Sequence, residues 1–287
     1  MQTKNSCTLE IVKTKESLRK SIQQYRQRRV KIAFVPTMGA LHDGHIALIA
    51  YARQLADVVV CSIFVNPTQF NDPKDLAKYP RPIEHDIAKL QAAACDVLFQ
   101  PEVDEMYGPN EQWHLDLGHL DQVLEGMHRP GHFQGVTQVV KKLFDAVQPD
   151  IACFGQKDFQ QYKVIAYMVE RLKLPVTLEL CPTVREPDGL AMSSRNVRLT
   201  PQGRGHALAI YRTLLQTKAD FGKKNLHSLR DEAIAKLKDS AGLRLEYFAI
   251  YDRETFTEAT GETAGRPSIA LAAAWVDGVR LIDNIFL

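Results

Sequence analysis

Two patterns of apolar residues alternate along the N-terminal part of the chain. Short segments rich in apolar residues occur at 31–35, 58–65, 96–99, 151–154 and 174–181, and apolar residues recur at helical spacing at 17–27, 46–56, 83–94 and 136–147. The short segments predict strands. The one at 58–65 is apolar almost throughout, which favours a strand buried on both faces of a parallel sheet, and 46–56 predicts the helix that connects it to the strand before it. This alternation favours the α/β class with a Rossmann-like doubly wound parallel sheet, whose ligands bind beyond the carboxyl ends of the strands.

The pattern changes after residue 183. The loop at 182–196 has the Pro and Gly content of a hinge, and beyond it helical patterns at 202–221 and 226–239 precede strands at 243–251, 268–275 and 279–282. Helices followed by strands are typical of an α+β unit. We therefore predict two domains: a Rossmann-like ligand-binding domain at 1–183 and a smaller α+β C-terminal domain at 184–287 that closes over the ligand.

The loop after the first predicted strand carries the most distinctive motif. It reads Pro36-Thr37-Met38-Gly39-Ala40-Leu41-His42-Asp43-Gly44-His45 and leads into a helix predicted from Ile46. A helix start offers unpaired N–H groups to a phosphate, and Gly39 and Gly44 lack side chains that would block a nucleotide. His42 and His45 are three residues apart, so both imidazoles can donate toward one phosphate oxygen.

The same residues have simpler interpretations. Histidines near a helix start are often surface residues, and Asp43 could be an N-cap. The histidine pair could also bind a metal, but no second cluster at a recognisable spacing supplies the remaining ligands that zinc requires. An H-x-G-H turn of this kind resembles the signature of the HIGH-type nucleotidyltransferase superfamily, and this resemblance favours a phosphate site.

Two further polar loops follow predicted strands. Asn66 and Gln69 come after the strand at 58–65, where their amides offer donors and acceptors to a hydroxy acid. Lys157 and Asp158 come after the strand at 151–154, where they supply a cation for phosphate and an acceptor for ribose hydroxyls. Taken singly, these loops are also typical of a polar turn and of a surface Lys–Asp pair. Their shared position at strand ends favours one ligand site.

The loop at 182–196 contains a fourth polar cluster. Ser193, Ser194 and Arg195 place two hydroxyls and a guanidinium in succession, which suits the binding of a polyphosphate. The alternative is a helix N-cap followed by a surface arginine. The rest of the C-terminal segment shows no obvious catalytic chemistry.

Composition narrows the class of protein. The hydrophobic fraction of 45% and the charged fraction of 24% are those of a globular protein, and a net charge of +2 is too small to indicate a nucleic-acid or membrane surface. The N-terminus lacks an apolar signal region, and no apolar run approaches the ~20 residues that span a bilayer. The five cysteines, none in a C-x-x-C pair, are expected to be reduced thiols in a cytoplasmic protein.

Taken together, the motifs resemble those of the pantothenate synthetase (pantoate–β-alanine ligase) family. The resemblance extends from the first strand to the last residues through P-T-M-G-A-L-H-D-G-H, S-I-F-V-N-P-T-Q-F, Y-P-R, R-P-G-H-F-Q-G-V, F-G-Q-K-D-F-Q-Q, D-G-L-A-M-S-S-R-N and R-L-I-D-N. It implies ATP-dependent condensation of pantoate with β-alanine through a pantoyl adenylate, with release of AMP and pyrophosphate. It also implies Mg2+, a cytoplasmic homodimer and a role in coenzyme A synthesis.

The resemblance further implies roles for individual residues. His45 would be the principal proton donor with His42 as its partner, and Lys157 would join them in catalysis. Gln69 and Gln161 would hold pantoate, with Asn66 on the same rim, and the region of Gln69 would also receive β-alanine. The implied ATP-binding residues are Met38, Gly39, Ala40, Leu41, His42, Asp43, Gly44, His45, Gly155, Gln156, Lys157, Asp158, Val184, Met192, Ser193, Ser194 and Arg195.

One position departs from the family pattern. The family usually reads G-E-K-D where this chain has Gly155-Gln156-Lys157-Asp158, so an uncharged amide replaces a carboxylate. We expect the enzyme to be active and Gln156→Glu to alter activity only modestly. The rival hypotheses are another adenylyl or cytidylyl transferase, a fragment of an aminoacyl-tRNA synthetase, and a nucleotide sensor without catalysis.

Overall fold

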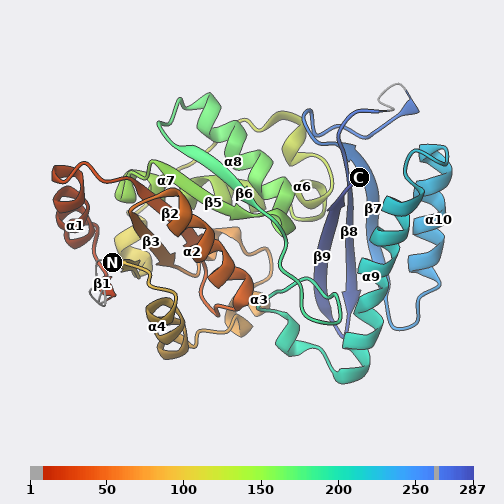
Figure 1. Cartoon of the computed structure of the whole chain (residues 1–287), viewed down its shortest axis with the longest axis horizontal. Helices are drawn as coiled ribbons and strands as arrows, with labels where there is room; N and C mark the ends of the chain where they lie inside the picture. The colour runs from red at the N-terminus through yellow and green to blue at the C-terminus, as the bar shows by residue number, and fades with distance from the viewer. Residues whose placement is uncertain (1–8, 262–264) are drawn as a thin grey trace, which may run out of the picture. The chain divides into compact units, whose positions relative to one another are not determined.

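The computed structural model describes residues 9–261 and 265–287, and it divides into two compact units. The first unit contains the chain up to Gly155 together with Gln160–Cys181, and the second contains Gln156–Phe159 and Pro182–Leu287 (Figure 1). The domain boundary expected at residue 183 stays a prediction. The expectations for Cys7 and for the extreme N-terminus lie outside the described residues.

A sheet of six parallel strands forms the centre of the first unit. Its order is β1-β4-β3-β2-β5-β6. The strands are β1 Glu10–Val12, β2 Ile32–Thr37, β3 Val58–Ile63, β4 Val97–Phe99, β5 Ile151–Gly155 and β6 Thr177–Cys181. The strand order reverses between β2 and β5, which is the place where doubly wound sheets bind their ligands. The predicted α/β fold with a Rossmann-like sheet is confirmed.

Helices cover both faces of this sheet. The helices of the first unit are α1 Lys15–Gln27, α2 Asp43–Leu55, α3 Pro73–Lys78, α4 Ile83–Ala92, α5 Val103–Met106, α6 Glu125–His128, α7 His132–Val147 and α8 Phe159–Arg171, and it has 3-10 turns at η1 Pro67–Gln69 and η2 Gly118–Asp121. Figure 1 shows α2 lying across the strands, where Ile49 and Ala52 pack on Ala33 and Val35 of β2. On the opposite face, Phe34 of β2 packs edge-on against Phe144 of α7.

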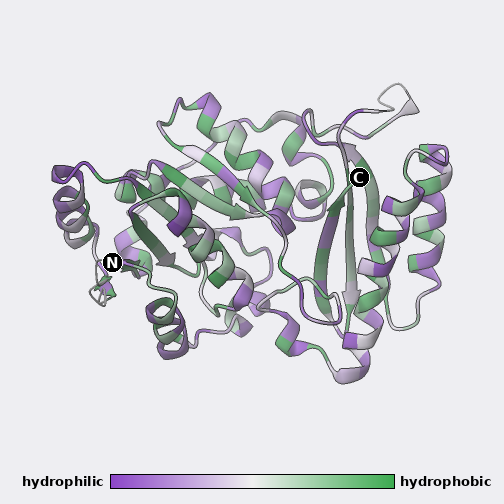
Figure 2. Ribbon diagram, viewed as in Figure 1, coloured by the Kyte–Doolittle hydropathy of each residue, from purple (hydrophilic) through white to green (hydrophobic). Residues whose placement is uncertain are grey.

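Burial on both faces explains why the strands are apolar throughout. In β3 every side chain is buried, and β2 has only Pro36 partly exposed. Figure 2 shows this hydropathy along β2, β3 and β5, while polar residues are concentrated on α1. Burial of apolar surface stabilises the folded unit by about 25 cal/mol for each Å2.

Several element boundaries differ from those predicted. Helix α2 begins at Asp43 rather than Ile46, with His42 as its N-cap residue, and α7 begins at His132 after Gly131 turns the chain at a φ of 79°. Helix α8 was not predicted, so Gln161 lies on its first turn and not in a loop. Polar residues at these helix starts concealed the helical period from the sequence pattern.

The second unit contains a three-stranded antiparallel sheet in the order β7-β8-β9. Its strands are β7 Arg244–Asp252, β8 Ser268–Val276 and β9 Val279–Phe286, and its helices are α9 Pro201–Asp220 and α10 Leu226–Lys238, with 3-10 turns at η3 Gln156–Asp158 and η4 Asn196–Arg198. Ile210 and Leu214 of α9 and Leu237 of α10 pack in one core with alternate residues of the sheet. The predicted α+β architecture is confirmed, and β9 extends beyond the expected end at Ile282.

The described cysteines fit the expectation of reduced thiols. Cys61, Cys95, Cys153 and Cys181 are free and buried. Burial raises the pKa of the Cys95 thiol to about 12, so this thiol is protonated at neutral pH. Within the described chain, no helix is both long enough and apolar enough to span a membrane.

The contact of α7 with η1 generates a first prediction. A Cβ atom on Gly135 of α7 would lie 2.4 Å from the carbonyl oxygen of Thr68, so Gly135→Ala must push η1 away from the helix. We expect the free energy of unfolding in urea to fall by about 1–3 kcal/mol.

The matched control for this variant is Gly205→Ala in α9. A Cβ atom on Gly205 meets nothing within 4 Å, so alanine should stabilise that helix by up to about 1 kcal/mol. Equal effects of the two substitutions would contradict a steric role for Gly135.

Candidate active site

Asp86 of α4 holds the loop that follows β2. Its carboxylate accepts the N–H groups of Ala40 at 2.8 Å and Leu41 at 2.7 Å, and the side chain is only 2% exposed. Lys89, one turn later, donates to the carbonyl of Leu41 at 2.6 Å. Burial raises the pKa of Asp86, and the two N–H donors oppose that shift. The backbone of this loop is therefore fixed by one helix through both donors and acceptors.

The conformation of the loop explains its glycine. Gly39 has a φ of 81°, and a Cβ atom there would lie 2.9 Å from Ile63 and 3.0 Å from Asp86. Ala40 is also left-handed, at a φ of 50°, a strain that the Asp86 contacts offset. The N–H groups of Gly39, Ala40 and Leu41 donate to Thr37 and Asp86. A phosphate that binds to backbone N–H groups of this segment would therefore contact those at the start of α2.

The two histidines of the motif lie side by side at the N-terminus of α2. Their ring centroids are 4.0 Å apart, and the backbone N–H of His42 donates to Nδ1 of His45 at 3.3 Å. An Nδ1 atom that accepts a hydrogen bond carries no proton in the neutral ring, so the proton of His45 resides on Nε2. His45 is thereby prepared to donate from Nε2.

Asn66 is a buried support for Gln69. The side chain of Asn66 is 1% exposed, and its Nδ2 donates to Oε1 of Gln69 and to the carbonyl of Gly135, each at 3.1 Å. Its Oδ1 accepts from the hydroxyl of Tyr107 at 2.6 Å and from Thr68. These bonds occupy the amide of Asn66, so its side chain supports Gln69, Thr68 and the start of α7.

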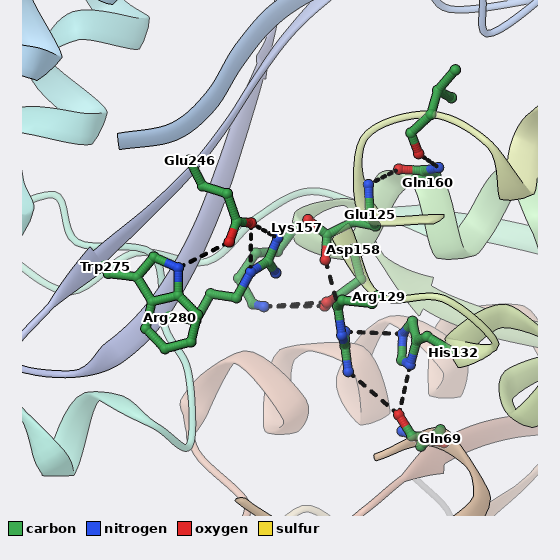
Figure 3. Close-up of polar contacts among 11 residues, drawn as sticks. Gln69, Glu125, Arg129, His132, Lys157, Asp158, Gln160, Glu246, Trp275 and Arg280 are labelled. Carbon is green, nitrogen blue, oxygen red and sulfur yellow. Dashed lines mark hydrogen bonds and ion pairs between the residues drawn. The ribbon is translucent and has the colours of Figure 1, made fainter. Parts of the chain in front are cut away.

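Gln69 is held at both its side chain and its backbone. Its Nε2 donates to the sulfur of Met38 at 3.0 Å, which joins η1 to the loop after β2. Its carbonyl accepts from Nδ1 of His132 at 2.8 Å, and Nε2 of His132 lies 3.0 Å from the guanidinium of Arg129 (Figure 3). Arginine can only donate, so Nε2 of His132 accepts and Nδ1 carries the proton toward Gln69.

A cavity of about 370 Å3 adjoins these residues within the first unit. Met38, Gly39, Phe64, Pro67, Arg81 and Asp86 are among the residues that line it. Its volume suits a small organic ligand, and Arg81 places a positive charge on its wall. Because its lining includes Met38 and Gly39 of the loop after β2 and Pro67 of η1, the cavity lies between these two segments.

Two adjacent glutamines at the start of α8 have different positions. Gln160 is buried and donates to the carbonyls of Leu120 and Val123, each at 2.9 Å, and it accepts from the N–H of Glu125 (Figure 3). Gln161 is partly exposed. Gln160 thus has a structural role, which leaves Gln161, as the sequence analysis expected, as the candidate for ligand contact.

In the second unit, Lys157 and Asp158 form an ion pair at 3.2 Å on η3. The Lys157 side chain is 20% exposed and that of Asp158 is 42% exposed, so both are accessible to a ligand. The preceding residue, Gln156, is buried and bonds to Asn284. The polar turn after β5 therefore has one inward and two outward side chains.

The loop that precedes η4 folds as a small hairpin. The N–H of Met192 donates to the carbonyl of Val184 at 3.0 Å, and Arg185 pairs with Ala191 as an isolated bridge. The N–H of Arg195 donates to the hydroxyl of Ser193 at 3.3 Å. Ser193, Ser194 and Arg195 are partly exposed at the end of this hairpin. Their partial exposure places these three side chains at the surface of the second unit.

The predicted site residues thus form two sets. The first unit contains 38–45, Asn66, Gln69, Gly155 and Gln161, and the second contains 156–158, Val184 and 192–195. No role for Asp86, Arg129, His132 or Asn284 followed from the sequence. Arg129 and His132 lie in the family-like motif R-P-G-H-F-Q-G-V, and Asn284 lies in R-L-I-D-N; these motifs were the only sequence signal for the three residues. Nothing in the local sequence distinguishes Asp86 from a surface residue.

The described residues do not form a metal site by themselves. Among residues 9–261 and 265–287, no group of three or more His, Cys, Asp or Glu side chains is arranged to hold a metal ion. The histidine pair is accordingly better suited to hydrogen bonding than to zinc coordination.

These features define a class of protein. The switch point of a doubly wound sheet, a histidine pair at a helix start, and a lysine turn directly after a central strand are typical of an α/β enzyme that binds a nucleotide.

Comparison with known proteins identifies the family. Residues 10–286 match the model of the family described as pantoate-beta-alanine ligase, and the chain belongs to that family. It is 43% identical over 281 residues to the pantothenate synthetase of Thermotoga petrophila, with 97% of this chain and 100% of the relative covered. It is 46% identical over 280 residues to that of Pseudomonas entomophila, with 96% of each covered.

Solved structures agree with this assignment. The pantothenate synthetase of Thermus thermophilus matches with a TM-score of 0.90 at 42% identity, covering 96% of this chain and 98% of that one. The pantoate-beta-alanine ligase of Francisella tularensis, complexed with beta-gamma ATP and beta-alanine, matches with a TM-score of 0.80 at 36% identity, covering 96% and 97%.

The Asp86 contacts generate a second prediction. Asp86→Asn replaces one acceptor oxygen by an NH2 group and leaves the N–H of Ala40 or Leu41 buried without its partner. We expect the free energy of unfolding to fall by about 1–3 kcal/mol, and the KM for ATP to rise. Urea unfolding and steady-state kinetics measure the two effects.

The control is Glu84→Gln, which changes an exposed carboxylate to an amide on the same helix. Equally small effects of the two substitutions would show that Asp86 does not hold the loop.

Proposed function

We propose that this chain condenses pantoate with β-alanine in two steps at the expense of ATP. The observation that carries the proposal is the match to the pantoate-beta-alanine ligase family over residues 10–286. The complex of the Francisella tularensis ligase with beta-gamma ATP and beta-alanine supports it. The chain thereby acts in the synthesis of pantothenate and, further on, of coenzyme A.

The chemistry requires an activated acid. A carboxylate resists attack by an amine because its leaving group would be oxide. In the first step a carboxylate oxygen of pantoate bonds to the α-phosphorus of ATP, and pyrophosphate leaves. In the second step the amine of β-alanine attacks the acyl carbon of the adenylate, AMP leaves, and the nitrogen loses a proton. Negative charge grows on the phosphates in the first step, so preorganised donors accelerate it.

The first unit supplies the residues nearest to the reacting groups in this proposal. The segment Met38 to His45 contacts ATP, and His45 donates from Nε2, a direction supported by the hydrogen bond at its Nδ1. His42 assists as its neighbour. Gln69 and Gln161 hold pantoate, and the region of Gln69 receives β-alanine. Asn66 contributes by holding Gln69.

The second unit supplies the remaining contacts with ATP. Lys157, Ser193, Ser194 and Arg195 bind its phosphates, as cations and hydroxyl donors suit that role. The residues proposed to frame the nucleoside are Asp158, Val184 and Met192, together with Gly155 at the end of β5 and the backbone of Gln156. The accessible positions of Lys157 and Asp158 support this assignment.

Several broader properties belong to the same proposal. Mg2+ accompanies ATP and is bound mainly by phosphate oxygens and water, the usual mode for this ion. The chain acts as a homodimer and in the cytoplasm. Its substrates are small molecules, and it binds neither nucleic acid nor membrane, in keeping with a net charge of +2.

The decisive experiment is pantoate-dependent exchange of labelled pyrophosphate into ATP without β-alanine. The two-step mechanism predicts exchange, and addition of β-alanine should yield pantothenate and AMP in equal amounts. No exchange would favour a nucleotide sensor. Exchange that depends on another acid would favour a different adenylyl transferase, and retardation of tRNA at low salt would favour a synthetase fragment.

The role of His45 leads to a third prediction. His45→Ala removes a donor that acts on developing charge, so turnover should fall about a hundredfold or more while the KM for ATP changes less. Single-turnover formation of the adenylate isolates the affected step. His227→Ala, at a histidine with a 72% exposed side chain on α10, is the control. Near-normal turnover of His45→Ala would remove this residue from the mechanism.

A further inference from the structure

We propose that the buried amide pair Gln156–Asn284 positions Lys157, and that this pair requires an uncharged hydrogen-bond donor at residue 156. The inference deepens the proposed function, since it rests on Lys157 binding the phosphates of ATP. It concerns Gln156 of the turn after β5 and the terminal R-L-I-D-N segment, to which no role was given.

Asn284 fastens η3 to strand β9. Its side chain is 2% exposed. Its Nδ2 donates to the carbonyls of Gln156 at 2.8 Å and Lys157 at 2.9 Å, and its Oδ1 accepts from Nε2 of Gln156 at 3.1 Å. The backbone on both sides of the Lys157 Cα atom is therefore tied to one side chain.

The orientation of both amides follows from the partners. Backbone carbonyls can only accept, so the two hydrogens of the Asn284 amide must point at η3 and its Oδ1 must face residue 156. That oxygen needs a donor, which the Gln156 amide provides. A carboxylate at residue 156 would place two acceptors against each other in a buried site, a costly arrangement.

The geometry leads to a different expectation from the one drawn from the sequence. Gln156→Glu was expected to change activity only modestly because Lys157, Asp158 and the glycine turn remain. The side chain is instead buried and acts as a donor inside the protein. In this chain the amide is the complement of Asn284, and the substitution should be harmful at neutral pH.

The adjacent residue of β9 holds the other proposed phosphate segment of the unit. Asp283 accepts from both terminal nitrogens of Arg185, at 2.7 and 2.9 Å, and Arg185 also donates to the carbonyl of Asn284 at 3.3 Å. The guanidinium lies 3.7 Å from the ring centroid of Tyr211 on α9. Burial raises the pKa of Asp283, and the Arg185 charge opposes the shift.

Successive residues of a strand point to opposite faces, so Asp283 and Asn284 can hold different segments. One strand thereby sets the position of both the hairpin that carries Ser193 to Arg195 and the turn that carries Lys157. The strand itself is rigidly paired, with Asp283 opposite Ala272 and Asn284 opposite Leu271 of β8.

The pH dependence of Gln156→Glu tests the proposal. Below its pKa the introduced carboxyl is protonated, and its O–H can donate to Oδ1 of Asn284; above its pKa it cannot. Burial opposite an acceptor raises that pKa. The neighbouring charged groups are Lys157 and Asp158 on its own segment, and the Arg185–Asp283 pair next to Asn284 on β9.

The experiment compares Gln156→Glu, Gln156→Met and wild type between pH 5.5 and 8.5. At high pH, Gln156→Glu should raise the KM for ATP at least tenfold with a smaller change in kcat, and the defect should narrow as the pH falls. Gln156→Met, which lacks a donor at every pH, should give a smaller defect that does not change with pH. Gln202→Glu, the same charge change at an exposed residue of α9, is the control.

Urea unfolding of the same variants provides a readout that does not depend on catalysis. Gln156→Glu should lose stability relative to wild type as the pH rises, whereas Gln202→Glu should not. Kinetics of Gln156→Glu that match Gln202→Glu, or a defect of equal size at every pH, would overturn the inference. A wild-type chain without pantoate-dependent exchange would instead refute the proposed function, while the unfolding data would still decide whether the amide pair holds η3.

Discussion

The capture of two backbone N–H groups by Asp86 is the constraint on which the N-terminal half of the site depends. Where β2 leaves a sheet buried on both faces, its backbone polar groups enter a desolvated turn and must find partners inside the protein. Asp86 accepts from Ala40 and Leu41, and Lys89 donates to the carbonyl of Leu41. With the turn fixed, α2 begins at a defined residue, and the two imidazoles are presented together at its N-terminus.

The same physical solution recurs at the other functional turns. Asn66 holds η1 beside α7, and Asn284 holds η3 beside β9, in each case through an amide that donates to a backbone carbonyl and accepts with its oxygen. Amides suit these places because one side chain can both donate and accept without burying a charge. The residues proposed to contact substrate, such as Gln69 and Lys157, are neighbours of these anchors.

This division between anchor and contact residues clarifies the relation to the family. The chain shares 43–46% identity with the Thermotoga petrophila and Pseudomonas entomophila relatives over almost its whole length, and its fold matches the Thermus thermophilus structure closely. Gln156 is buried and bonds to Asn284, so it belongs with the anchors, whereas Lys157 beside it is one of the proposed contact residues.

The sequence by itself determined the α/β fold, most strands of the sheet and the motifs from which the family could be inferred, because periodicity and local turn chemistry act over short stretches of chain. It could not assign the anchors. Asp86 bonds to Leu41 and Ala40, which precede it by 45 and 46 positions in the sequence, and Asn284 bonds to Gln156 across 128 positions. Only the tertiary structure decided that Asn66 and Gln156 face inward, since burial and the direction of a hydrogen bond depend on partners that folding brings together.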